Sequence, residues 1–190
     1  MRLKHTLLTV PMMVAAMPAF AHTGSHAASG LVDGFAHPFS GLDHTLAMVA
    51  VGLFATVLGG RALWALPASF VSMMLVGGLM GILGIEIPAV EAGIVLSVVI
   101  LGAVLAAGSR CLISVAMMLT GMFAIFHGYA HGAEMPPEAA AALYCLGFVS
   151  STALLHGVGL AIGIVLGNRK VVYRLAGAGI SIAGVALSLS

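Results

Sequence analysis

The chain has 190 residues, of which 61% are hydrophobic and only 7% are charged, and its formal net charge is +1. Soluble domains carry roughly 25% charged residues, so this composition excludes a soluble globular protein and indicates a polytopic membrane protein. The apolar runs are long and continuous, which predicts an all-α membrane helix bundle. Because the chain has neither a basic cluster nor a phosphate-binding loop, we expect no nucleic acid partner and no use of ATP.

The first residues have the pattern of a secretory signal peptide over positions 1–21. A positively charged end is followed by a short apolar run and by the small-residue cleavage pattern AFA at positions 19–21. Cleavage would leave a single mature domain, 22–190, with His22 as its N-terminus outside the cytoplasm. An uncleaved anchor is the alternative, and the two prolines and the shortness of the apolar run count against it.

From His22 to Asp33 we expect a small, polar and mobile segment. A free α-amine beside the imidazole of His22 can chelate a divalent metal ion, and His26 is close enough in sequence to help. A mature N-terminus with no part in metal binding is an equally good interpretation.

Six membrane spans of about 20 residues each follow, the length that a bilayer requires. They are expected at 38–58, 62–83, 89–107, 111–130, 139–166 and 171–189. With the mature N-terminus outside, every Lys and Arg of the mature domain falls at the inner side and every Glu at the outer side. This agrees with the positive-inside rule, and five or seven spans would break the pattern.

The stretch HPFSGLDHTLAM begins at His37 and carries two imidazoles and a carboxylate into the first span. Asp43 is the one Asp or Glu of the sequence placed well inside a span, where an ionisable group is costly and therefore a functional-site candidate. If the helix begins at Pro38, then Ser40, Asp43 and His44 lie on one stripe. A histidine and an aspartate that bond each other only to pack the bundle are the alternative.

A second cluster, FHGYAHGAE, ends the fourth span. His127 and His131 are four residues apart and share a helix face, and Glu134 follows three residues later on roughly the same side. Paired histidines at this spacing are a known way to bind a divalent metal ion. The topology puts this cluster at the same outer face as the first motif, and the two motifs at matching depth indicate a metal site more strongly than either does alone.

Glu91 and His156 are further candidates. Glu91 opens the third span from outside and is either an entrance ligand or a surface acid. His156, near the middle of the fifth span, is either a deeper station on an ion path or a packed histidine bonded to Ser151 or Thr152. The methionines of the spans are most simply apolar filler, and Met48 alone is a candidate soft ligand.

The sequences HPFSGLDH and FHGYAHGAE resemble the HupE/UreJ family of membrane nickel/cobalt permeases, and the resemblance covers essentially the whole mature chain. It implies uptake of Ni²⁺, with Co²⁺ as a second candidate, across the bacterial inner membrane to supply hydrogenase or urease maturation. Neither motif departs from the family pattern. Carried onto this chain, the motif residues of the family are His37, Asp43, His44, His127, His131 and Glu134.

The chemistry of these residues fits a secondary permease that holds no permanent cofactor and carries the metal ion as its substrate. Imidazole and carboxylate suit nickel, cobalt and zinc, so selectivity must come from geometry and supply. We expect His22 and His26 to gather the ion, the outer ligands to bind it and His156 to relay it inward. The sequence leaves a homo-oligomer open.

The main alternative is an intramembrane zinc hydrolase. Such enzymes also place histidines and a carboxylate near one face, with three protein ligands and an activated water. Asp43 or Glu134 would then be the general base. Short loops and the lack of an evident substrate groove count against this alternative, and a haem protein with paired membrane histidines fits less well still.

Overall fold

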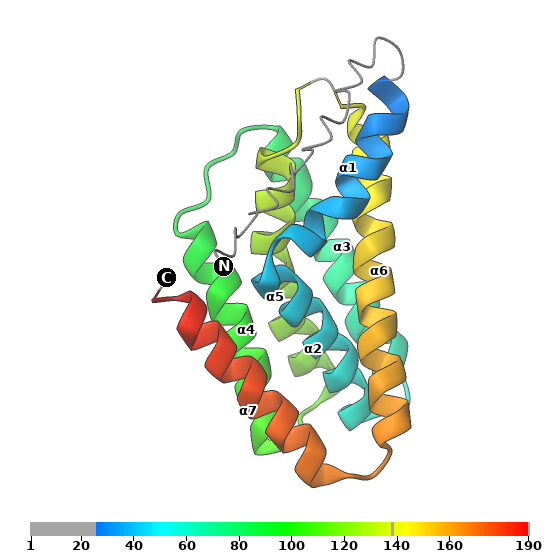
Figure 1. The fold of residues 1–190 in the computed structure, drawn as a ribbon, viewed down its shortest axis with the longest axis vertical. Coiled ribbons are helices and arrows are strands. Elements are labelled where there is room, and N and C mark those ends of the chain that lie inside the picture. The colour runs from blue at the N-terminus through cyan, green and yellow to red at the C-terminus, as the bar shows by residue number, and fades with distance from the viewer. Residues whose placement is uncertain (1–25, 138, 190) are drawn as a thin grey trace, which may run out of the picture.

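The computed structural model describes residues 26–137 and 139–189, which form seven α-helices with no strand among them (Figure 1). The predicted all-α membrane bundle is thereby confirmed. The helices are α1 His26–Ser40, α2 Leu42–Leu58, α3 Ala62–Ile82, α4 Val90–Ala107, α5 Ile113–Ala133, α6 Ala141–Leu166 and α7 Lys170–Leu187. The predicted signal peptide and His22 lie outside the described residues.

Five helices, α3 to α7, are each long and apolar enough to cross a membrane, and α1 and α2 pass the same test together as one bent span. The six predicted spans agree with this count when the bent pair is taken as one. The helices from α2 onward alternate in direction (Figure 1). Consequently the loops with Arg61, Arg110 and Arg169 lie at one end of the bundle, and those with Glu86 and Glu134 lie at the other.

The predicted start of the first span is wrong. The segment expected to be mobile is helical from His26 onward, and Pro38 lies near the end of α1 instead of in the first turn of a helix. A proline cannot donate the hydrogen bond that continues a helix, and α1 ends two residues later at Ser40. Gly41 is extended, with φ −105° and ψ 125°, and the chain bends there by 85°. Ser40 and Asp43 therefore lie on different helices.

Glycines make the closest helix contacts. A Cβ on Gly34 of α1 would collide with the carbonyl of Tyr144 in α6. A Cβ on Gly52 of α2 would collide with the carbonyl of His156, which also belongs to α6. A Cβ on Gly128 of α5 would likewise collide with a carbonyl of α3. Small residues let helices approach this closely in a membrane, so glycine fixes the spacing of the helices that carry the histidines.

Candidate metal centre

Three helices bring four predicted histidines into one row beside the bend. His37 of α1 has Nε2 2.9 Å from Oε2 of Glu134, and its ring centroid is 4.8 Å from that of His131 in α5. The His131 ring is 4.8 Å from the ring of His44 in α2, which is 4.7 Å from the ring of His127. We call these four residues the histidine row. Its members come from both sequence motifs.

The histidine row runs from the surface into the core of the bundle. The side chains of His37 and Glu134 are 27% and 58% exposed, and that of His44 is 14% exposed. His131 and His127 are fully buried. A group entering at the exposed end would therefore meet imidazoles at every depth down to His127.

Asp43 orients the ring of His44. Its Oδ1 lies 2.8 Å from Nδ1 of His44 and 2.7 Å from the backbone nitrogen of the same residue. A carboxylate accepts and cannot donate, so Nδ1 carries the proton and Nε2 keeps a lone pair. That Nε2 is buried and has no hydrogen-bond partner among the described residues. Gly41 leaves room for the pair, because a Cβ there would lie 2.6 Å from the Asp43 oxygen.

Ser97 of α4 orients the ring of His127. The hydroxyl of Ser97 donates its single proton to the carbonyl of Ile94 at 2.6 Å. Nε2 of His127 lies 2.9 Å from the Ser97 oxygen, so this nitrogen must donate. Nδ1 of His127 then keeps the lone pair, and it too is buried without a partner in the described part of the chain. The rings of His44 and His127 thus each have one nitrogen held by a hydrogen bond and one nitrogen with a lone pair that can bind a metal ion.

The fully buried ring of His131 has no hydrogen bond at either nitrogen within residues 26–137 and 139–189. It is held by packing instead, since the ring of Phe148 in α6 stacks on it with centroids 5.5 Å apart. Within the same residues, no three His, Cys, Asp or Glu side chains form a group that could hold one metal ion as they stand. The arrangement offers neighbouring pairs of ligands in series.

His156 lies beyond the row, next to an aromatic ring. Phe70 of α3 is fully buried, and its ring centroid is 5.7 Å from that of His127 and 5.0 Å from that of His156. The Phe70 ring therefore packs against both the innermost histidine of the row and His156.

The proposed bond between His156 and a neighbouring hydroxyl is not formed. Ser151 donates to the carbonyl of Phe148, and Thr152 donates to the sulfur of Met74. Both ring nitrogens of His156 are buried without a partner among the described residues. The interpretation of His156 as a histidine packed through Ser151 or Thr152 is thus wrong, and its role as a deeper station stays a prediction.

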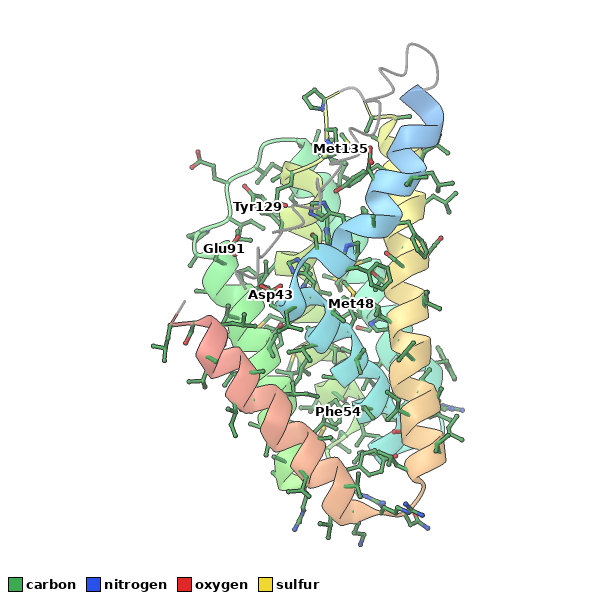
Figure 2. The ribbon with its side chains drawn as sticks, viewed as in Figure 1. Asp43, Met48, Phe54, Glu91, Tyr129 and Met135 are labelled. Carbon is green, nitrogen blue, oxygen red and sulfur yellow. The ribbon has the colours of Figure 1, made fainter. Side chains whose placement is uncertain are left out.

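Glu91 and Asp43 line one cavity of about 620 Å³ between α2, α4 and α7. Figure 2 shows both carboxylates near the starts of their helices, on the same side of the bundle. Since Asp43 also bonds His44, the cavity that Glu91 lines lies next to the histidine row. Binding of a metal ion by Glu91 stays a prediction, as it does for Met48, which is fully buried in α2.

Sequence reasoning missed Ser97 and Phe70. A lone serine inside an apolar span is a signal, because its hydroxyl needs a partner, yet the sequence does not say which one. Phe70 carries no signal at all among so many apolar residues. The side chain of His26, at the start of α1, is outside the description.

The chain is similar to known proteins over nearly its whole length. The sequence model of the family described as HupE / UreJ protein matches residues 10–187. Protein HupE of Rhizobium leguminosarum bv. viciae is 44% identical over 190 residues, which cover 97% of this chain and 98% of that relative. No solved structure matches.

Proposed function

Because this chain belongs to the HupE/UreJ family, we propose that it is a secondary transporter that takes up Ni²⁺, with Co²⁺ as a second substrate. The protein would span the bacterial inner membrane with its mature N-terminus in the periplasm. The metal ion that it delivers would serve the maturation of hydrogenase or urease.

The observation that carries this proposal is the histidine row with its free nitrogens. A buried polar atom without a partner costs about 1–3 kcal/mol. Among the described residues, the rings of His44, His127 and His131 in the row, with that of His156 beyond it, contain six such atoms. Apolar side chains of similar size would pack the bundle without this cost. A series of imidazole lone pairs from surface to core is instead suited to a cation that moves along it.

The ligand set favours transport over tight retention. Transport needs binding that is firm enough to capture an ion and weak enough to release it, and imidazoles with a few carboxylates and no thiolate meet that need. Glu134 and His37 would capture the ion at the exposed end, and Asp43 would hold His44 ready to receive it. A dication moving inward gains about 4.6 kcal/mol per 100 mV of membrane potential (2 × 2.3), so uptake needs no ATP.

The row also favours a transporter over a zinc hydrolase. A hydrolase needs three protein ligands around one ion and an open position for water. Here the neighbouring rings follow one another at 4.7 to 4.8 Å, and the described ligands do not gather around one point. Tightly held, stoichiometric zinc in the purified protein would reverse this preference.

The test is accumulation of radioactive nickel by cells that express the chain, with cobalt and zinc as competitors. Asp43→Asn removes the charge that fixes the tautomer of His44, and we expect it to abolish uptake while the protein stays in the membrane. Glu86→Gln is the matched control, because Glu86 is an exposed acid in a loop at the same end of the bundle. Normal uptake by the Asp43→Asn protein would overturn the proposal.

A further inference from the structure

A second cavity, of about 460 Å³, lies at the opposite end of the bundle from the histidine row. It is formed by the end of α2, the loops that follow α4 and α6, and the start of α7, at the lower end of Figure 1. Its cationic lining residues are Arg110, Lys170 and Arg174. Three positive charges thus face one space.

None of these cations forms an ion pair with a carboxylate of residues 26–137 and 139–189. The ion pairs found there are His37 with Glu134 and His44 with Asp43, both near the other end. All three side chains are exposed, so water and salt screen much of their mutual repulsion, and an anion placed between them would relieve the remainder. The positive charge around the cavity therefore favours an anionic ligand.

The position of Arg174 is fixed by the backbone. Its Nη2 donates to the carbonyl of Ala107 at the end of α4, at 3.3 Å. Gly108, with φ 63°, leaves the space that the guanidinium occupies, because a Cβ there would lie 3.2 Å from Nε of Arg174. One edge of the guanidinium is thus anchored, and the side chain is held at the cavity.

The hydroxyls in the cavity wall have no proton left for a ligand. Tyr173 donates to the carbonyl of Gly163 at 2.5 Å, and Thr56 donates to that of Leu53 at 2.7 Å. The side-chain donors that remain in the lining are the three cations and the amide of Asn168, so charged groups provide most of the hydrogen bonds that a ligand can receive. Guanidinium and ammonium groups together are the donors that bind phosphate oxygens best.

We propose that this cavity binds a phosphate group, held by Arg110, Lys170 and Arg174. The headgroup of an anionic phospholipid is one source of that group and free inorganic phosphate is the other. The positive-inside rule assigns this end to the cytoplasmic leaflet, where basic pockets between helices bind anionic headgroups. The proposal does not depend on the metal that the protein carries.

The test measures how strongly the full-length protein, purified in detergent, binds added phosphatidylglycerol, with phosphatidylcholine as the control lipid and a rise in melting temperature as the readout. Thermal protection by inorganic phosphate is measured in the same way. The triple variant Arg110→Gln, Lys170→Gln, Arg174→Gln removes the three cations. The control variant Arg61→Gln, Arg169→Gln removes two cations from the same end that do not line the cavity. Cations near an anionic surface contribute roughly fivefold each to binding, so the triple variant is expected to bind about a hundredfold more weakly.

Loss of phosphatidylglycerol binding in the triple variant, with binding kept in the control, supports a lipid headgroup. Loss of protection by inorganic phosphate in the same variant supports free phosphate. Equal binding by the wild type and the triple variant overturns the proposal, and so does an equal loss in the control. Since removing three inner cations also weakens the topology signal, Arg110→Gln alone is measured as well, with a loss of roughly fivefold expected.

Discussion

Replacing Ser97 by alanine removes the hydrogen bond that holds the ring of His127. In the wild type, the Ser97 hydroxyl is committed to the carbonyl of Ile94 and accepts from Nε2 of His127 at 2.9 Å. Alanine leaves this buried nitrogen without a partner. The proton can then sit on either ring nitrogen, and the ring is no longer oriented by α4.

The size of the loss in nickel affinity distinguishes the loss of one fixed tautomer from the loss of a fixed ring orientation. Free choice between two tautomers halves the fraction of rings with a lone pair on Nδ1, a loss of about twofold. Losing the group that orients a metal-binding histidine costs more, about 10- to 100-fold in metal affinity. We therefore expect the nickel concentration for half-maximal uptake to rise about 10- to 100-fold in Ser97→Ala.

The assay is initial-rate uptake of radioactive nickel at several concentrations, normalised to the amount of protein in the membrane. Ser97→Thr keeps a hydroxyl and should stay near the wild type. Ser181→Ala is the matched control, because it removes a hydroxyl that bonds the carbonyl of Val99 in the same helix as Ser97. A rise of only about twofold would refute the orienting role, and no rise beyond the Ser181→Ala value would remove His127 from the path.

Three further predictions separate packing, capture and relay. Gly128→Ala places a Cβ against a carbonyl of α3, and we expect it to lower the melting temperature in detergent by destabilising the bundle about 1–3 kcal/mol. Gly157→Ala, which meets open space, should melt no lower than the wild type, and equal melting of both would contradict the packing argument. Glu134→Gln at the exposed end should raise the half-maximal nickel concentration several-fold, roughly 5-fold, with the maximal rate kept. His156→Leu should instead lower the maximal rate of uptake and leave the half-maximal nickel concentration unchanged. A lower maximal rate in Glu134→Gln, or a higher half-maximal concentration in His156→Leu, would contradict the order of these two residues along the path.

The spans were predictable from the sequence because a bilayer imposes one physical requirement on every residue of a crossing helix. Apolar length fixed the helices, and the distribution of Arg and Glu fixed how the loops alternate. The bend was not predictable in the same way. Pro38 and Gly41 both fit a helix start. In the structure, α1 instead runs from His26 to Ser40 and packs closely against α6 at Gly34, a contact between distant segments that the sequence does not show.

The ligands within one helix were also predictable, because His127 and His131 share a face by their spacing alone. Contacts across helices were not. That Ser97 meets His127, and that Phe70 packs against His156, depends on how closely the helices approach. That approach is set by glycines such as Gly128, which the sequence shows as small residues without naming their partners.

The bend at Gly41 brings two histidines of the first motif against one histidine of the second. In a straight helix, His37 and His44 would stand on the same face but about 10 Å apart along the axis. The ring of His131 lies 4.8 Å from both of their rings, which a straight segment would make difficult. Because the chain turns by 85°, the two histidines close around one ring of α5. The extended Gly41 thus joins an exposed ligand to buried ones, which is what an ion must find when it leaves water for the bundle.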